Sequence, residues 1–377
     1  MKINFVFLFC LLSFYGIAQD VKITHGPYLQ NVGEHEATIV WITDNDAISW
    51  VELVPANENF DAKERPQYYQ TKDGNRVIGK LHKITIPGLE QGTKYRYRIF
   101  SRAAIITMLT YGKVTSSDKQ SQRFTTFDNQ KTEISFMVLN DIHGRLDDLT
   151  ALSKNVKYGT TDLMIFNGDM VDFMLTEQQF FSNCMDKSVE LFASEIPVIY
   201  ARGNHETRGF YNWYFSDYFP TNNGKPYHAF RHGSVYFIVL DSGEDKEDSH
   251  AEYFGLAQFD AYRTEQQEWL KKELQSESFR SAPYKVVIMH IPPGRWGWHG
   301  NIEVQKKFLP LLNKAGITIM FCGHTHSYEY IEPKDGLHDF PILINAANTS
   351  LEVKATKNKM SIIRKDTEGK ELNKFAF

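Results

Sequence analysis

The sequence predicts an N-terminal all-β sandwich followed by an α/β sandwich, and three observations favour this fold class. Residues 20–127 contain short segments rich in β-branched and aromatic side chains, separated by turn residues. From residue 134 onward, apolar runs of strand length alternate with segments of helical pattern. Several of these runs end at a glycine or polar break followed by Asp, Asn or His, as is typical of parallel strands that carry functional side chains at their carboxyl ends.

The bulk composition is that of a globular protein. The chain has 377 residues, of which 42% are hydrophobic and 23% charged, so it can bury a large core, and its length favours two domains. A net charge of -4 gives no reason to expect a nucleic-acid polymer or an anionic membrane surface as a partner. Cys184 and Cys322 lie far apart in segments of different type, so we expect no disulfide framework.

Residues 1–18 have the pattern of a secretion signal. Met1-Lys2 supplies the positive start, residues 3–15 are almost wholly apolar, and Gly16 and Ala18 put small residues at the cleavage-recognition positions. The apolar run is too short to span a bilayer, and no later run is long enough. We therefore expect cleavage before Gln19 and export to the periplasm, the cell surface or the medium.

The first domain is expected to occupy residues 20–127. Its predicted strands are 37–42, 49–54, 82–86, 94–99 and 122–126. The stretch Leu89, Gly92-Thr93, Tyr95 and Tyr97-Arg98 resembles the end of a fibronectin type III module. This part carries no candidate catalytic cluster, so we expect a structural or packing role, with glycan or substrate binding as the alternative.

A polar linker at 128–133 precedes the second domain, which is expected over residues 134–377. Its predicted strands are 134–139, 163–166, 198–200, 235–240, 285–289, 318–321 and 342–344. Its predicted helices are 147–156, 177–194, 264–275 and 302–315, the third beginning with a Thr264–Gln267 capping box and the fourth ending at Gly316. The tail, at 360–364 and 372–377, predicts a β-hairpin paired onto the catalytic sheet.

Four segments and one isolated histidine predict a metal site. The segments are Asn140-Asp141-Ile142-His143, Gly168-Asp169-Met170-Val171-Asp172, Gly203-Asn204-His205-Glu206 and Gly323-His324-Thr325-His326, and the isolated residue is His290. Asp141 and His143 are two residues apart, so at an extended strand end both side chains point the same way, and the same holds for the histidines of the last segment. Any one segment alone is equally well explained by a surface Asp or a satisfied His. Together they form a mixed nitrogen and oxygen ligand set for two divalent cations.

The order of these motifs resembles the calcineurin-like metallophosphoesterase superfamily, over about residues 134–350. The resemblance implies a four-layer α/β sandwich with two metals at its strand ends. By the resemblance, one metal is held by Asp141, His143, Asp169 and His326, and the other by Asp169, Asn204, His290 and His324, with Asp169 bridging. The front domain, beginning Gly26-Pro27-Tyr28-Leu29-Gln30, and the stretch Thr325-His326-Ser327-Tyr328-Glu329 are similar to segments of purple acid phosphatases.

The chain departs from the purple acid phosphatase pattern in two places. Their first motif has Gly where His143 stands, and their second has a Tyr where Asp172 stands. That Tyr binds ferric iron and gives the colour, so its absence argues against a purple Fe(III) centre. Zn, Mn, Fe(II) or mixtures stay open as the two divalent metal ions.

The resemblance implies a mechanism in which a metal-bridged hydroxide attacks phosphorus in line with the leaving oxygen. His205 is the candidate general acid, and Asp172 is the candidate partner that orients it, as in the phosphoprotein phosphatases of the same superfamily. Those enzymes carry an Arg where Phe173 stands, so phosphate contacts must come from elsewhere. The arginines nearest the motifs are Arg145, Arg202, Arg208 and Arg295. Arg295 is the preferred candidate because it lies in a loop that leaves a ligand strand, although a solvated or salt-bridged Arg is the alternative for each.

The sequence therefore favours an exported metal-dependent phosphoric ester hydrolase that acts on a small phosphate ester, most readily an acid phosphatase-like phosphomonoesterase. A phosphodiesterase or nucleotidase is the first alternative, because a group of aromatic residues could stack on a base. They are Tyr211, Trp213, Trp296 and Trp298, although core packing is the preferred interpretation for Trp213. The second alternative is a catalytically inactive surface-binding protein. A metalloprotease is not indicated, since no His-Glu-x-x-His helix is present.

Overall fold

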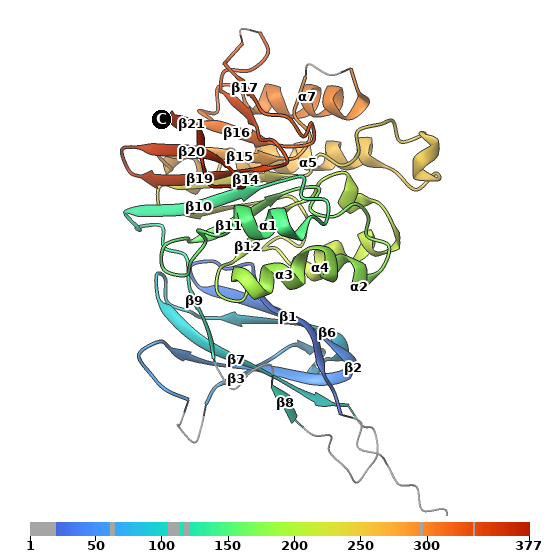
Figure 1. Cartoon of the computed structure of the whole chain (residues 1–377), viewed down its shortest axis with the longest axis vertical. Helices are drawn as coiled ribbons and strands as arrows, with labels where there is room; N and C mark the ends of the chain where they lie inside the picture. Colours follow the sequence, from blue (N-terminus) through green and yellow to red (C-terminus); the bar gives the residue numbers. More distant parts are fainter. Residues whose placement is uncertain (1–19, 61–64, 105–113, 117–120, 295–296, 335) are drawn as a thin grey trace, which may run out of the picture.

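The computed structural model describes residues 20–60, 65–104, 114–116, 121–294, 297–334 and 336–377. The β-rich N-terminal part lies at one end of the long axis and the α/β part at the other (Figure 1). The predicted signal segment, Arg295 and Trp296 lie outside the described residues. Across the described residues, no helix combines the length and the apolar character that crossing a bilayer requires.

The N-terminal part is built around one long strand, β2 (Glu36–Pro55). Its first half pairs with β1 (Ile23–Gln30) and its second half with β7 (Lys94–Ala103), while β6 (Ile78–Pro87) runs along the first half and past the bend. The shorter strands here are β3 (Gln67–Tyr69), β4 (Thr71–Lys72), β5 (Asn75–Arg76), β8 (Val114–Ser116) and β9 (Gln122–Thr125). The prediction of an all-β region is thus confirmed, but the two strands expected at 37–42 and 49–54 form a single element.

The bend in β2 lets its two halves face each other across a core. The Trp41 indole N–H donates to Ser101 Oγ on β7 at 2.9 Å, and Trp41 is fully buried. Tyr97 and Ile99 alternate inward along β7 and join the same hydrophobic cluster. The two β-branched and aromatic halves of β2 flank the polar residues 43–46, and both halves bury apolar side chains.

The α/β part contains two sheets with mainly parallel centres. The first has the order β12-β11-β10-β19-β20-β21 and the second β13-β14-β15-β16-β18-β17. The strands of the first sheet are β10 (Glu133–Leu139), β11 (Leu163–Asn167), β12 (Val198–Ala201), β19 (Thr349–Thr356), β20 (Met360–Asp366) and β21 (Glu371–Ala376). Those of the second are β13 (His228–His232), β14 (Val235–Leu240), β15 (Tyr284–Met289), β16 (Ile319–Cys322), β17 (Glu329–Ile331) and β18 (Ile342–Ile344).

Apolar side chains join the two sheets face to face. Phe136 of β10 meets Phe237 of β14 edge-on, with ring centroids 5.0 Å apart, and one buried cluster includes residues of both sheets. The strands are almost continuously apolar because both of their faces are buried. The tail hairpin lies in the first sheet, where β20 pairs with β19 and β19 pairs with β10.

Helices pack on the outer faces of the two sheets. Over the first sheet lie α1 (Leu146–Leu152), the consecutive helical pieces α2 (Glu177–Phe180), η1 (Phe181–Met185), α3 (Asp186–Ser188) and η2 (Val189–Ala193), and α4 (Phe215–Tyr218). Over the second lie α5 (Phe259–Glu273), α6 (Glu277–Ser281) and α7 (His299–Leu312). Short 3-10 turns occur at η3 (His205–Thr207), η4 (Phe210–Tyr214) and η5 (Ala251–Tyr253). Cys184 and Cys322, in the described part of the chain, are buried and free.

The predicted start of the third helix at Thr264 is wrong. The helix α5 begins at Phe259, and Thr264 lies inside it with its hydroxyl donating to the Asp260 carbonyl. The first amides of α5 are capped by the Asp248 carboxylate, which accepts from Phe259 N at 2.8 Å and from Asp260 N at 3.1 Å. A capping group eleven residues away leaves no local sequence signal.

The N-terminal part packs directly on the first sheet and its helices. Tyr28 donates its hydroxyl to the Tyr218 carbonyl at 2.9 Å, and Gln30 donates to the Val198 carbonyl of β12 at 3.0 Å. Tyr97 donates to the Ser194 carbonyl at 2.6 Å. These buried contacts fix the β-rich part against the α/β part.

Candidate metal centre

The predicted metal ligands lie in loops that follow parallel strands of both sheets. The loop after β10 carries Asp141 and His143, that after β11 Asp169, that after β12 Asn204, the end of β15 His290, and the loop after β16 His324 and His326. Because the carboxyl ends of the two sets of strands meet at one edge of the molecule, residues up to 185 positions apart lie together.

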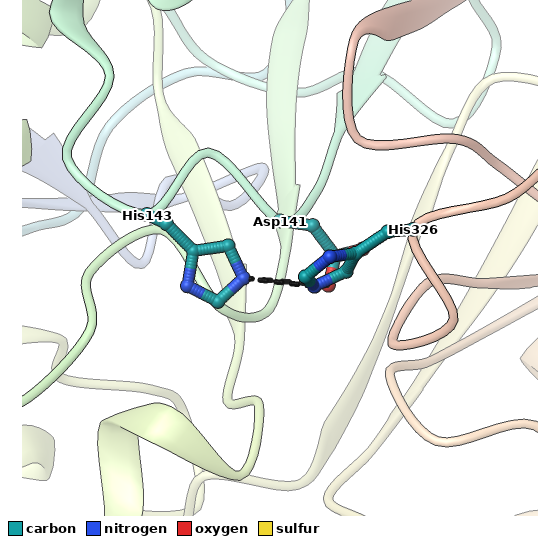
Figure 2. A group of neighbouring side chains, drawn as sticks. All are labelled: Asp141, His143 and His326. Carbon is teal, nitrogen blue, oxygen red and sulfur yellow. Dashed lines mark hydrogen bonds and ion pairs between the residues drawn. The ribbon is translucent and has the colours of Figure 1, made fainter.

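The first group consists of Asp141, His143 and His326, whose ligand atoms all lie within 4.8 Å of one another. Figure 2 shows the two imidazole rings inclined to one another with a nitrogen of each pointing at the other, and Nε2 of His143 lies 3.0 Å from Nε2 of His326. The Asp141 Oδ1 atom lies 3.3 Å from Nε2 of His326 and 3.9 Å from Nε2 of His143. This group combines one carboxylate and two ring nitrogens, which suits a borderline divalent cation.

The second group consists of Asp169, His290 and His324. The His290 Nε2 atom lies 3.0 Å from Asp169 Oδ2 and 3.9 Å from Asp141 Oδ1, so it links the two groups. Asn204 joins the second group, since its Oδ1 atom lies 3.0 Å from His324 Nδ1. The structure thus brings together every residue that the sequence singled out as a metal ligand.

Several site residues have a left-handed backbone instead of the expected extended one. The φ angles are 52° at Asp141, 49° at His143, 55° at Asp169, 72° at His324 and 57° at His326. Such conformations cost about 1–3 kcal/mol each for non-glycine residues and are characteristic of functional sites. The side chains of Asp141 and His143 therefore converge because the loop turns, and not because they alternate along a strand.

Backbone hydrogen bonds between neighbouring loops hold these turns. The Asp141 amide donates to the Gly168 carbonyl at 2.9 Å and the His143 amide to the Asp169 carbonyl at 3.0 Å. Gly168 has a φ of 81°, and a Cβ added there would lie 2.4 Å from Nδ1 of His290. Only glycine fits between this loop and the His290 ring.

Three buried ligand atoms, Asp141 Oδ1, His290 Nε2 and His324 Nε2, have no hydrogen-bond partner outside the ligand set among the residues that the structure describes. Asp141 Oδ1 and His290 Nε2 instead face other candidate ligands, at 3.3 Å from His326 and 3.0 Å from Asp169. The His290 Nδ1 atom donates to the Asn167 carbonyl at 2.7 Å, which turns Nε2 toward the ligand set, where the neutral ring can bind a cation. Buried polar atoms that face mainly one another fit metal ions.

The local electrostatics also favour cations. Burial by itself would lower the pKa of His290. The carboxylates of Asp169 and Asp141 have the larger, opposite effect and raise that pKa to about 10. Burial raises the pKa of Asp169, but the His290 and His205 rings lower it well below its ordinary range. Burial, together with the nearby His290, lowers the pKa of His324 to about 4. The negative potential that holds a proton on His290 would equally stabilise a divalent cation.

Glu206 is a positioning residue to which the sequence analysis gave no role. It is fully buried, and its carboxylate accepts from the amides of Asp169 at 2.8 Å and Gly203 at 2.9 Å. It also accepts from the Met170 amide and the Tyr200 hydroxyl, both at 2.8 Å. Glu206 thereby ties the loop after β11 to the loop after β12. A Glu three residues after Gly203 was the available signal, but its contacts are not all local.

His205 lies beside the second group, with Nε2 3.9 Å from Asp169 Oδ2. Its Nδ1 atom donates to the Asp172 carbonyl at 2.8 Å, which fixes the ring and turns Nε2 toward the site. The Asp172 carboxylate instead accepts from Nδ1 of His143 at 2.9 Å. The sequence interpretation of Asp172 as the orienting partner of His205 thus needs a correction, since only its backbone oxygen serves His205.

The candidate arginines within the described residues are ion-paired. Arg145 Nε lies 2.7 Å from Asp148, Arg202 Nη2 2.7 Å from Asp241, and Arg208 Nε 2.9 Å from Glu244. Arg145 also donates to the Asp141 carbonyl at 2.6 Å. The salt-bridged alternative therefore describes these three, and Arg295 lies outside the described residues.

The expectation that Trp213 belongs to the core is wrong. Its side chain is 63% exposed, because the short turn η4 presents Phe210 and Tyr214 to solvent as well. Trp298 is also exposed, and its ring meets that of His324 edge-on at 5.6 Å. Trp298 therefore lies against one of the candidate ligands.

Comparisons with known proteins agree with this arrangement. The sequence model of the calcineurin-like phosphoesterases matches residues 134–328. Among curated proteins, purple acid phosphatase 21 of Arabidopsis thaliana is 23% identical over 81% of this chain and 66% of its own length. Purple acid phosphatase 1 of Ipomoea batatas is 25% identical over 86% of this chain and 67% of its own length.

A third relative is the Fe(3+)-Zn(2+) purple acid phosphatase 12 of Arabidopsis thaliana, which is 24% identical over 83% of this chain and 65% of its own length. The chain thus spans about two thirds of the length of these curated relatives. The match to the family model covers more than half of the chain and contains every candidate ligand. This chain belongs to the calcineurin-like phosphoesterase family.

Proposed function

We propose that this protein is an exported phosphomonoesterase that uses two divalent metal ions. The observation that carries the proposal is the pair of neighbouring ligand groups, Asp141, His143 and His326 beside Asp169, His290 and His324, which loops of both sheets bring together. Family membership and the purple acid phosphatase relatives support a metal-dependent phosphatase.

The proposed ligands of the first metal are Asp141, His143, Asp169 and His326, and those of the second are Asp169, Asn204, His290 and His324. The two ligand groups and the 3.9 Å approach of His290 to Asp141 support a dinuclear site. The hydrogen bond from His143 to the Asp172 carboxylate supports a ligand role for His143, because metal-binding histidines commonly donate their second ring N–H to a carboxylate. Asp172 stands where purple acid phosphatases have the Tyr that binds ferric iron, so Zn, Mn or Fe(II) are the proposed metals.

Bound divalent cations activate water and neutralise the charge of the phosphoryl group. His205 is the proposed general acid, and its position beside Asp169, with Nε2 facing the site, supports that role. The Asp172 carbonyl fixes the His205 ring, so that Nε2 can give its proton to the leaving oxygen. Glu206 is proposed to keep Asp169 and the His205 loop in register.

A phosphodiesterase or nucleotidase is the second candidate. The observation in its favour is the exposure of Trp213 and Trp298 near the centre, where aromatic faces can stack on a base. The phosphorus of a diester carries a second alcohol, so a phosphodiesterase also needs room for that group beside the centre.

The finer architecture is part of the proposal. We propose a signal segment at 1–18, a fibronectin type III-like sandwich at 20–127, and a four-layer phosphoesterase domain at 134–377 that ends in the β-hairpin. The N-terminal sheet built on β2 and the two helix-covered sheets that follow it support these boundaries.

The test compares hydrolysis of p-nitrophenyl phosphate and bis-p-nitrophenyl phosphate by the purified chain. We expect turnover of the monoester that is lost in Asp169→Asn and kept in the matched surface variant Asp147→Asn. A preference for the diester would favour the second candidate. Absence of turnover of either ester by protein fully loaded with metal would contradict the proposal.

A further inference from the structure

Exposed apolar side chains gather beside the candidate general acid. They line a cavity of about 550 Å³ and include Phe173, Leu175, Phe210, Trp213, Phe254 and Leu256. Phe254 is 86% exposed and Leu256 68% exposed, values that are unusual for large apolar residues. The volume lies within the range of ligand pockets, about 300–1,000 Å³.

The charged side chains of the cavity wall, Arg208, Glu244 and Glu252, already have ion-pair partners. Arg208 forms a two-pronged ion pair with Glu244, with Nε and Nη2 each 2.9 Å from a carboxylate oxygen. Glu252 lies 3.0 Å from the Lys246 ammonium group. The cavity therefore offers an apolar surface with no free charge among these residues, which suits an uncharged apolar group.

The wall next to the centre is held by backbone contacts. Met174 N donates to the Arg208 carbonyl at 2.8 Å, and Tyr211 N donates to the Met174 carbonyl at 2.8 Å. These bonds join the loop that carries Phe173 to the turn η4. The cavity is thus a built feature of three loops that follow β11, β12 and β14.

His205 lies at the boundary between the cavity and the metal ligands. Its ring centroid lies 6.0 Å from that of Phe173, and its Nε2 atom lies 3.5 Å from Arg208 Nη1. The same Nε2 atom lies 3.9 Å from Oδ2 of the candidate ligand Asp169. An ester oxygen that receives the His205 proton therefore has the phosphorus on the metal side and its carbon substituent on the cavity side.

We propose that this cavity holds the leaving alcohol and that the protein selects phosphate monoesters of bulky apolar alcohols, aromatic or long-chain. This inference rests on the proposed function. In the step, the bond between phosphorus and the ester oxygen breaks while a water oxygen bonds to phosphorus. The ester oxygen takes the Nε2 proton of His205 and leaves as the alcohol, and the proton lost by water returns to His205 through solvent.

Two pairs of substrates test the size preference at nearly constant leaving-group acidity. They are 2-naphthyl against phenyl phosphate, and hexyl against ethyl phosphate. We expect kcat/KM to favour the larger member of each pair about tenfold or more, as is typical when extra apolar groups enter a matching pocket. Equal values within each pair, with metal-dependent turnover of both, would overturn this inference and leave the proposed phosphatase standing.

Variants of the wall locate the preference. Trp213→Ser and Leu256→Ser should bring the naphthyl-to-phenyl ratio of kcat/KM toward one, whereas Leu372→Ser, an exposed apolar residue on β21, should not change it. Binding of 2-naphthol can be measured through the quenching of tryptophan fluorescence. This binding should weaken in Leu256→Ser and not in Leu372→Ser. An unchanged ratio in both wall variants, or a dimer that Leu256→Ser dissociates, would contradict the leaving-group role.

Discussion

Glu206 holds two loops of the candidate centre with one buried carboxylate. Its four close partners are the amides of Asp169, Met170 and Gly203 and the Tyr200 hydroxyl. Every one of these groups is a donor, so an acceptor-only side chain is required. Burial and the nearby Asp169 raise the pKa of Glu206, and its hydrogen bonds oppose that rise.

Glu206→Gln should therefore destabilise the fold although the side chain keeps its shape. The new amide group would direct N–H bonds at backbone donors, and we expect a loss of about 2–4 kcal/mol in the free energy of unfolding. Urea unfolding measures the loss, with the exposed Glu190→Gln as the matched control. A change within about 0.5 kcal/mol for both variants, the range of ordinary surface substitutions, would contradict the positioning role.

The identities of the ligand residues could be predicted from the sequence, but their geometry could not. Motif spacing identified Asp141 and His143, yet their positive φ angles depend on hydrogen bonds to the loop after β11. Asp172 accepts a hydrogen bond from His143 with its carboxylate and one from His205 with its carbonyl, and both contacts likewise depend on the folded loop. Such contacts join residues about 30 positions apart and leave no local pattern.

At the scale of elements, buried parallel strands were the easiest to predict. The expected segments 235–240 and 342–344 coincide with β14 and β18, because fully buried strands give uninterrupted apolar runs. The edge strand β13 was missed, since its polar and aromatic residues resemble a loop. The continuity of β2 was missed because Thr43, Asp44, Asn45 and Asp46 have turn-like composition and predicted a break between two strands.

His82 on β6 provides a pH-dependent contribution to stability away from the centre. It is buried against Trp41, and burial lowers its pKa to about 4. The unfolded chain binds a proton near pH 6.5 and the folded chain near pH 4, so the free energy of unfolding rises with pH between these values. This stabilisation is complete above pH 6.5 and is lost as the pH falls toward 4.

His82→Gln should flatten that dependence. We expect the difference in free energy of unfolding between pH 7 and pH 4.5 to shrink by about 1–3 kcal/mol. Urea unfolding at both pH values gives the difference, and His35→Gln, at an exposed histidine of the same region, is the control. An equal pH dependence in wild type and His82→Gln would show that another group is responsible.

At the scale of the whole molecule, the centre depends on two sheets that meet face to face. The group of Asp141, His143 and His326 and the group of Asp169, His290 and His324 each contain residues from loops of both sheets. The sequence predicted the order of strands and the motifs at their ends, and the family resemblance supplied the pairing of metals. The contacts of Tyr28 and Gln30 with the α/β part could not be predicted, because they depend on how the two parts pack.

The central claim is that this juxtaposition of sheets binds two metal ions. Metal content and thermal unfolding of the same samples, before and after chelation and reloading, test it most directly. We expect about two metal ions per chain and, at a free metal concentration near 100 Kd for each site, a stabilisation of about 2.7 kcal/mol per site, or about 5 kcal/mol for both. That stabilisation corresponds to a rise in Tm of roughly 7 °C. Asp169→Asn should lose most of both effects while Asp147→Asn keeps them. Reloaded wild-type protein that holds no metal and melts at the same temperature as the chelated sample would contradict the claim.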